Sequence, residues 1–321
     1  MKKAVITGGA GFVGRALTDK LLAEGWSVRA LSRGARPAAD IEIVQVDYND
    51  ISALSKALGG ADTVFHLAAA IFAFNKEEFE RANVGVTANL AKAAATAGVK
   101  NFVYLSSQAA AGPSEYKENP KMEDDTPAPV SDYGATKLAA EGVVNNLPAD
   151  IHKVILRAPV VYGGGDSGVS KIAAWVKRGI MANAGSADTF FNFVYIDDLA
   201  NALYLAATTP AANSNTYFVC EAAPYSWEYF INTMAEAMGR PRPFIFSLPY
   251  FALEIVAFIY EAAARITGAQ PALNYDKIKE AHIKGHWVCS PKKWTALTGQ
   301  KFTPLKEGLE KSFKQPSVVK I

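Results

Sequence analysis

The sequence predicts an α/β fold, a doubly wound parallel sheet with helices on both faces, followed by a smaller, mainly helical C-terminal part. Over the first two thirds of the 321 residues, short apolar runs alternate with longer stretches whose apolar residues recur at helical spacing. The first apolar run ends in glycines spaced three apart, and a helical pattern follows directly. After residue 165 the helical patterns cluster and prolines interrupt them. Alternating strands and helices favour a parallel sheet covered on both faces.

The predicted strands and helices follow one another along the chain. Apolar runs predict strands at residues 4–7, 27–31, 42–46, 63–67, 102–106 and 153–158. Helical patterns lie between them, at residues 12–24, 50–58, 76–97 and 133–147. In the C-terminal part, helices are expected at residues 168–179, 226–238, 250–267, 274–282 and 304–314. The polar, proline-rich segment 114–129 predicts a surface loop that leads into the helix at 133–147.

The composition is that of an ordinary globular enzyme. Half of the residues are hydrophobic, a fifth are charged and the net charge is +2, so nothing indicates a nucleic-acid partner. Cys220 and Cys289 have neither metal-ligand nor disulfide-framework spacing, and we expect buried, reduced thiols and no metal. Met1 lies too close to the first strand for a signal peptide, which predicts a cytoplasmic protein.

The segment 244–268 is unusually rich in large apolar residues. Glu254, Glu261 and Arg265 fall on one side of a helix, and Pro249 precedes them, so the segment is poorly suited to cross a bilayer. We expect an amphipathic helix that packs on the protein or lines a substrate pocket. Peripheral contact of this helix with lipid is the less favoured alternative.

The glycines after the first strand indicate a phosphate-binding turn. Gly8 would let the chain reverse tightly, and Gly11 would let the main chain approach a pyrophosphate. Gly14 would let the helix pack closely, with its N-terminal N–H groups facing the phosphates. The spacing is G-x-x-G-x-x-G, and glycines required only by a tight turn are the alternative interpretation.

Tyr133 and Lys137 form a second candidate site. Residues four apart share one face of a helix, so an ammonium can lie beside a phenol. A nearby positive charge favours the phenolate, which makes tyrosine a usable proton donor and acceptor. Ser107, which ends the apolar run at 102–106, could bind the same substrate oxygen. An exposed Tyr/Lys helix pair is the alternative.

Together these motifs resemble the extended short-chain dehydrogenases/reductases, in the branch of 3β-hydroxysteroid dehydrogenases and dihydroflavonol reductases within the NAD-dependent epimerases/dehydratases. The resemblance covers nearly the whole chain and implies a Rossmann-type domain at residues 1–165, to which residues 193–220 return. It implies a substrate-binding part at 166–192 and 221–321, and a homodimer through the helices at 76–97 and 133–147. The matching segments are Thr7–Gly14, Asp47, Phe65–Ala69, Asn83, Thr87, Leu105–Ser107, Tyr133–Lys137, Arg157–Gly163 and Phe193–Leu199.

The resemblance also implies site residues. Ser107, Tyr133 and Lys137 would be catalytic. The cofactor would be bound by Thr7, Gly8, Gly11, Phe12, Val13, Gly14, Ser32, Arg33, Asp47, Tyr48, Leu67, Ala68, Ala69, Asn83, Tyr133, Lys137, Pro159 and Val160. The substrate would contact Ala70, Gln108 and Phe191. His66 is expected to support the cofactor loop, and Arg157 to be either functional or a buried, paired residue.

The end of the second strand favours NADP over NAD, the second choice. Ser32 stands where an acidic residue would bind both ribose hydroxyls, and Arg33 follows it. A hydroxyl and a guanidinium suit a 2′-phosphate, with Arg36 as a further basic side chain. A solvent-facing Arg33 is the alternative. Asp47 would accept from the adenine amine, or else cap the helix that begins near Ile51.

The residues after Ser107 narrow the chemistry. Gln108 and Ala109 stand where dehydratases of this family carry an acid pair. Phe191 stands where epimerases often carry an arginine that holds the sugar nucleotide. We therefore expect NADP(H)-dependent interconversion of a secondary alcohol and a ketone on a hydrophobic small molecule that is steroid-, polyketide- or flavonoid-like. The alternatives are an NAD-dependent nucleotide-sugar 4-epimerase and a non-catalytic cofactor-sensing protein.

Overall fold

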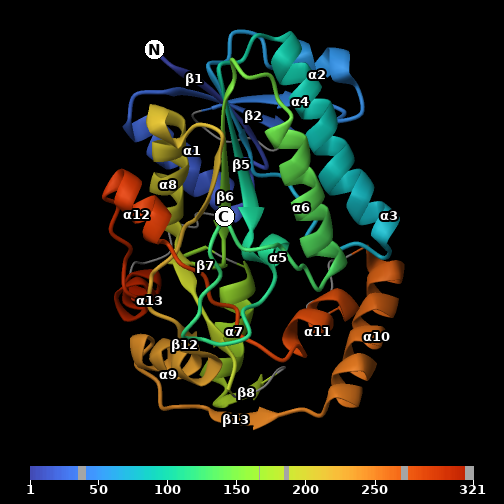
Figure 1. Ribbon diagram of the computed structural model, residues 1–321. Helices are drawn as coiled ribbons and strands as arrows, with labels where there is room; N and C mark the ends of the chain where they lie inside the picture. Colours follow the sequence, from blue (N-terminus) through green and yellow to red (C-terminus); the bar gives the residue numbers. More distant parts are fainter. Residues whose placement is uncertain (35–40, 166, 184–187, 269–273, 315–321) are drawn as a thin grey trace.

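A seven-stranded parallel sheet forms the centre of the N-terminal part (Figure 1). The computed structural model describes residues 1–34, 41–165, 167–183, 188–268 and 274–314. The strand order is β11-β6-β5-β4-β1-β2-β3, and all six predicted strands are confirmed. The strands are β1 (Lys3–Thr7), β2 (Ser27–Ser32), β3 (Glu42–Gln45), β4 (Thr63–His66), β5 (Asn101–Ser107), β6 (His152–Ala158) and β11 (Asn215–Phe218).

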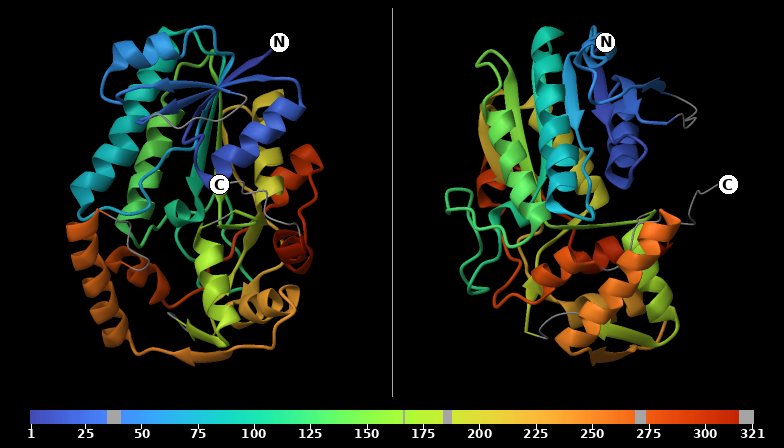
Figure 2. Two further views of the ribbon diagram at one scale, coloured as in Figure 1. Left: turned by 180° about the vertical axis from the view of Figure 1, so that it is seen from behind. Right: turned by 90° about the vertical axis from the view of Figure 1, so that its right-hand side faces the viewer.

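Helices cover both faces of this sheet (Figures 1 and 2). On one face α1 (Phe12–Ala23) packs against α8 (Ile196–Thr208). On the other face lie α2 (Ile51–Ala57), α4 (Val86–Thr96) and α6 (Asp132–Asn145). Each layer has its own buried apolar core, one built around Leu17 and Leu199 and the other around Leu54 and Leu90. Because both faces are covered, a central strand such as β4 is buried along its whole length, including its polar end residues Thr63 and His66.

The strand order reverses between β1 and β4. After β1 the chain builds β2 and β3 on one side, and it then returns to place β4 on the other side of β1. Thr7 and His66, the last residues of these two strands, are paired in register. Ligands of doubly wound sheets bind at such a reversal, outside the carboxyl ends of the strands. The fold therefore directs the search for a site to this edge.

Most of the C-terminal part lies beyond that edge of the sheet (Figure 1). Its helices are α7 (Ser167–Lys177), α9 (Trp227–Ala237), α10 (Tyr250–Thr267), α11 (Tyr275–Ala281), α12 (Lys292–Thr298) and α13 (Leu305–Lys314). It also holds three two-stranded sheets that the sequence analysis did not predict: β7 (Val160–Tyr162) with β10 (Phe193–Tyr195), β9 (Phe190–Phe191) with β12 (Tyr225–Ser226), and β8 (Ile180–Asn183) with β13 (Phe244–Ser247). The division into a cofactor-binding and a substrate-binding part stays a prediction.

The helix expected at residues 76–97 is present and contains a π-helical segment. The structure has α3 (Lys76–Phe79), a π-helical turn (Glu80–Gly85) and then α4. Short helices also form at α5 (Gln108–Ala111) and at a 3₁₀ turn (Pro210–Ala212). A π turn shifts the hydrogen bonds by one residue and is often found at functional sites. Here it contains Asn83.

The long helix α10 buries only one side. Leu253 and Ala257 pack with Ile278 of α11, whereas Phe251 and Phe258 are more than half exposed. Among the described residues, none of the helices combines the length and apolar character needed to cross a membrane. Cys220 and Cys289 are buried and free, as expected, although the fold brings their sulfur atoms to 3.6 Å.

Candidate active site

The turn between β1 and α1 is tight enough to require its glycines. Gly8 has a φ of +74°, in the left-handed region, and a Cβ there would lie 3.0 Å from the main-chain nitrogen of Ala68. A Cβ on Gly14 would lie 2.3 Å from the carbonyl oxygen of Gly8, so the first turn of α1 packs directly on the glycine turn. Gly11 caps α1 without a side-chain hydrogen bond. The N-terminus of α1 is therefore open to an anion at the strand reversal.

His66 supports this turn from within the core. Its Nδ1 lies 2.7 Å from the hydroxyl of Thr7, and its Nε2 lies 2.9 Å from the hydroxyl of Thr87. The Thr7 hydroxyl also accepts a hydrogen bond from the main-chain N–H of Ala68, at 3.2 Å. Burial, with a smaller contribution from Lys137, lowers the pKa of His66 to about 3. His66 is therefore neutral and structural, in agreement with the favoured interpretation.

Asn83 joins the loop after β4 to the helix that carries Tyr133. Its Oδ1 accepts from the N–H of Ala70 at 2.8 Å, and its Nδ2 donates to the carbonyl of Ala70 at 3.1 Å. Nδ2 also donates to the hydroxyl of Thr136 in α6, again at 3.1 Å. This buried side chain is fully engaged with protein, so it positions the residues that would face a cofactor rather than contacting one strongly itself.

Ser107, Tyr133 and Lys137 meet at the carboxyl end of β5. Ser107 is the last residue of β5, and its hydroxyl accepts from the N–H of Ala109 at 3.1 Å. Tyr133 lies in the first turn of α6, and Lys137 lies one turn later. The buried Lys137 ammonium donates to the carbonyl of Leu105 at 2.7 Å and lies 4.2 Å from the ring centroid of Tyr104.

The pKa values of this group differ from our expectation. Burial raises the pKa of Tyr133 to about 12, the charge of Glu280 acts in the same direction, and the Ser107 hydroxyl opposes them. Burial also lowers the pKa of Lys137 to about 7, against the attraction of Glu141. We expected Lys137 to lower the pKa of Tyr133. Burial instead shifts both pKa values toward the neutral forms, and with a pKa of about 7 Lys137 still carries its charge in about half of the molecules at neutral pH.

A buried ion pair holds α6 against the sheet. Arg157 in β6 donates from Nε and Nη2 to the two carboxylate oxygens of Glu141, at 2.9 and 2.7 Å, and both side chains are buried. Ser106 donates to the same carboxylate. Arg157 is thus the buried, paired residue of the two alternatives. Glu141 was missed, because one acidic residue in a helix gives no sequence signal of its partner.

The end of β2 presents the residues predicted to select the cofactor. Ser32 is half-buried, and its hydroxyl donates to the carbonyl of Gly34 at 2.6 Å. Arg33 is exposed, and Arg36 lies outside the described residues. The exposed Asp47 accepts from the N–H of Asn49 at 2.9 Å, so it forms a turn.

One alternative at this edge is corrected. The cap of α2 is Asp50, whose carboxylate accepts from the N–H of Ala53 at 2.9 Å, and not Asp47. The side chain of Tyr48 is buried in the core, and its hydroxyl donates to the carbonyl of Leu31 at 3.1 Å. The Tyr48 carbonyl accepts from Nδ2 of Asn89 at 3.0 Å, and the contact of Tyr48 with a cofactor stays a prediction.

The remaining predicted cofactor residues gather at the ends of neighbouring strands. Phe12 and Val13 begin α1, Leu67 and Ala69 follow β4, and Pro159 and Val160 follow β6. Because β6, β5, β4 and β1 are adjacent and parallel, all of these segments open toward the same edge.

The predicted substrate residues have different surroundings. Gln108 in α5 is buried, and its Nε2 has no hydrogen-bond partner among the described residues. Ala70 is half-buried beside Asn83. Phe191 is half-buried on β9 and meets the Trp227 ring edge-on, with ring centroids 6.2 Å apart. Next to Ser107 in the sequence, the Nε2 of Gln108 is therefore a buried donor with no partner among the described residues. Phe191 and Trp227, beyond residue 165, form a pair of packed aromatic rings.

A separate cavity of about 460 Å³ lies in the C-terminal part. Leu248, Tyr250, Leu253, His282 and His286 are among its lining residues. None of Ser107, Tyr133 and Lys137 lines it, so it is not the place where these three residues could act.

The strand order, with its reversal beside the glycine turn, defines an NAD(P)-binding protein of the doubly wound class. Residues 4–220 match the NAD dependent epimerase/dehydratase family. The chain belongs to this family and is an NAD(P)-dependent enzyme of the extended short-chain dehydrogenase/reductase type.

Curated relatives include reductases and a dehydrogenase. A 2-alkyl-3-oxoalkanoate reductase of Stenotrophomonas maltophilia is 30% identical, over 75% of this chain and 77% of that protein. A 3 beta-hydroxysteroid dehydrogenase/Delta 5→4-isomerase of Mycobacterium tuberculosis is 31% identical, over 75% and 70% of the two chains. The protein y4nG of Sinorhizobium fredii is 35% identical over 64% of this chain, but the match spans only 54% of y4nG.

A solved structure with the same fold is MoeE5 in complex with UDP-glucose and NAD. It has a TM-score of 0.78 and 25% sequence identity, and the superposition covers 97% of each chain. The expected fold class is confirmed.

Proposed function

We propose that this enzyme transfers hydride between NADP(H) and a hydrophobic secondary alcohol or ketone. The observation that carries the proposal is the meeting of Ser107, Tyr133 and Lys137 beside the glycine turn, with Gln108 rather than an acid following the serine. Without that acid the site has no group suited to expel water, so redox chemistry fits it better than dehydration.

Each side chain has a role in this reaction. A bound nicotinamide supplies or accepts the hydride. Tyr133, whose pKa is about 12, is protonated at neutral pH and can give its proton to the oxygen of a ketone. Ser107 donates a hydrogen bond to the same oxygen, and Lys137 would stabilise the phenolate left on Tyr133 while holding the ribose. The unpaired Nε2 of buried Gln108 can donate to a second oxygen of the substrate.

The cofactor proposed is NADP. At the end of β2 the exposed Arg33 and the hydroxyl of Ser32 are suited to a 2′-phosphate, and no acid at this position would repel it. The N-terminus of α1 fits a pyrophosphate, because no side chain caps its first N–H groups. NAD, which is bound in the MoeE5 structure, is the second choice.

The substrate proposed is a hydrophobic ketone. Phe191 stands in the sequence where the resemblance would put an arginine that holds a sugar nucleotide, and its ring packs against Trp227, which supports a hydrophobic substrate. The similarity to a 2-alkyl-3-oxoalkanoate reductase supports a ketone with an alkyl chain. A nucleotide-sugar epimerase is the second candidate, favoured by the similarity to MoeE5 bound to UDP-glucose. The homodimer, the cytoplasmic location and lipid contact through 244–268 stay predictions.

The test is to measure NADPH consumption, by its absorbance, with each compound of a substrate panel. Aliphatic 3-oxoacyl compounds, steroid ketones and flavonoid-like ketones are each compared with UDP- and TDP-sugars. We expect NADPH consumption with at least one hydrophobic ketone, and its loss in Tyr133→Phe while NADPH still binds. Conversion of a sugar nucleotide without net NADPH consumption would replace this proposal with the epimerase.

A further inference from the structure

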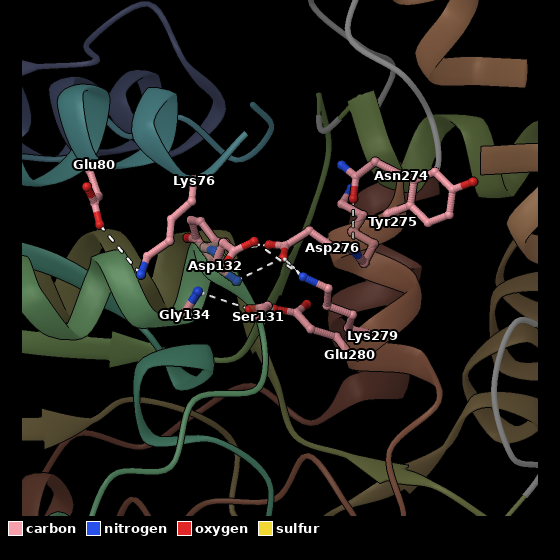
Figure 3. A network of polar contacts seen from close by, with 12 residues as sticks. Lys76, Glu80, Ser131, Asp132, Gly134, Asn274, Tyr275, Asp276, Lys279 and Glu280 are labelled. Atoms are coloured by element: carbon pink, nitrogen blue, oxygen red, sulfur yellow. Dashed lines mark hydrogen bonds and ion pairs between the residues drawn. The ribbon is translucent and has the colours of Figure 1, made fainter. Parts of the chain in front are cut away.

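The C-terminal part contacts the start of the catalytic helix through α11 (Figure 3). Asp276 of α11 accepts two hydrogen bonds from the start of α6. Its Oδ1 accepts from the main-chain N–H of Asp132 at 2.8 Å, and its Oδ2 accepts from the main-chain N–H of Tyr133 at 2.9 Å. The Asp276 side chain is 12% exposed. One carboxylate, 143 residues away in sequence, therefore holds the main chain of Tyr133 itself.

One turn further along α11, Glu280 continues the contact. Its carboxylate accepts from the hydroxyl of Ser131 at 2.6 Å, and that hydroxyl in turn accepts from the N–H of Gly134 at 3.0 Å (Figure 3). Trp287 donates from its ring nitrogen to the carbonyl of Glu280 at 3.1 Å, which fixes the end of α11. Asp276 and Glu280, one turn apart on α11, thus both form hydrogen bonds with residues 131–133 at the start of α6.

The first N–H groups of a helix have no partner within the helix and need acceptors from elsewhere. The side chain of Ser131, the residue before α6, accepts from the N–H of Gly134, and its carbonyl accepts from the N–H of Ala135. The N–H groups of Asp132 and Tyr133 are served by Asp276. A carboxylate at this place is also favoured by the helix dipole. The local sequence of α6 therefore leaves its first turn incomplete until α11 is docked.

We propose that α11 is a latch in which Asp276, as a positioning residue, fixes the main chain of Tyr133 when the C-terminal part docks on α6. The proposed function supplies the role of Tyr133 on which this inference rests. Because Asp276 bonds the main chain of Tyr133 itself, the catalytic tyrosine reaches its place only when the C-terminal part, which carries the predicted substrate residue Phe191, is docked. Lys279, half-exposed, bridges Asp132 and Asp276 at 3.3 and 3.6 Å and lies on the rim of the latch.

The test compares Asp276→Ala with Lys279→Gln, which removes the rim ion pairs and leaves both N–H bonds. The first readout is hydrogen exchange of the amides of Asp132 and Tyr133, and it needs no substrate. We expect exchange to become roughly tenfold or more faster in Asp276→Ala, the size of a lost helix cap, and to stay nearly unchanged in Lys279→Gln. Asp276→Asn keeps one acceptor oxygen, so its exchange rates at Asp132 and Tyr133 should lie between those of the other two variants. This variant keeps the experiment decisive if Asp276→Ala folds poorly.

The second readout is turnover with a ketone that the panel identifies. We expect kcat to fall about 10- to 100-fold in Asp276→Ala with little change in the Kd of NADPH, because a displaced Tyr133 harms the reaction and not the cofactor site. Unchanged exchange at Asp132 and Tyr133 would overturn the latch, as would equal losses in kcat and in NADPH affinity. If no ketone reacts, the proposed function fails while the exchange experiment still decides on the latch.

Discussion

For Tyr133 and Lys137, the sequence predicted the positions of the side chains but not their pKa values. The spacing predicted that they share a face of α6 beside Ser107, and the structure has that arrangement. The sequence could not show that burial would raise the pKa of Tyr133 to about 12 and lower that of Lys137 to about 7. Both pKa shifts come mainly from burial, which depends on the parts of the chain that pack around α6 in the folded protein. A protonated phenol at neutral pH is suited to reduction of a ketone.

Asp276 and Glu141 could not have been predicted at this scale. Each is a single acid in a helix, and its partner, Tyr133 or Arg157, lies elsewhere in the chain. Only the tertiary fold makes these pairs. Arg33 is different, because its place at the end of β2 follows from the strand pattern alone.

Arg33→Ala tests the cofactor preference. We expect the affinity for NADPH to fall about 10- to 100-fold, the size of a lost charge-assisted hydrogen bond, and the affinity for NADH to stay nearly the same. Fluorescence titration of the purified protein with both cofactors measures the change. Arg242→Ala, an exposed arginine before β13, is the matched control and should alter neither affinity. A preference for NADH that Arg33→Ala leaves in place would contradict the assignment.

At the scale of elements, length decided which parts could be predicted. Six strands of the main sheet and most of the longer helices left clear patterns and are present, whereas β11 (Asn215–Phe218) and α8 (Ile196–Thr208) were not among the predicted strands and helices. The missed sheets are built from short strands such as β9 (Phe190–Phe191) and β7 (Val160–Tyr162), too short for an alternating pattern to appear. The π turn around Asn83 was also missed, because its residues fit an ordinary helix equally well.

The contact between α1 and the glycine turn makes a prediction about Gly14. A Cβ there would meet the Gly8 carbonyl at 2.3 Å and the Gly9 Cα at 2.6 Å, and main chain cannot yield easily. We expect Gly14→Ala to lower the free energy of unfolding by about 1–3 kcal/mol and to weaken cofactor binding. Chemical denaturation and cofactor titration measure the two effects.

Gly142, inside α6, is the control for that substitution. An added Cβ would have nothing within 4 Å, so Gly142→Ala should stabilise the protein by about 0.5–1 kcal/mol and leave cofactor binding unchanged. If the two substitutions changed the free energy of unfolding and the cofactor affinity equally, the absence of a side chain at Gly14 would not be a requirement of the glycine turn.

At the scale of the whole molecule, two parts of the chain must be docked for the site to be complete. The sheet edge provides the glycine turn and Ser107, and α6 provides Tyr133 and Lys137. The C-terminal part provides Phe191 and the carboxylate of Asp276 that holds the start of α6. The sequence predicted the first of these contributions from motifs. The contribution of the C-terminal part depends on where the residues after 165 pack against the N-terminal part, and no local sequence pattern predicts that packing.

The central claim is net hydride transfer from NADPH to a hydrophobic ketone, and deuterium tracing tests it most directly. The enzyme is incubated with NADPH carrying deuterium at the transferable position, together with a reactive ketone from the panel or with UDP-glucose. We predict deuterium on the new carbinol carbon in an amount equal to the NADPH consumed, and none with Tyr133→Phe. Epimerised UDP-glucose that carries no deuterium from the added cofactor, with no ketone reduced, would contradict the claim.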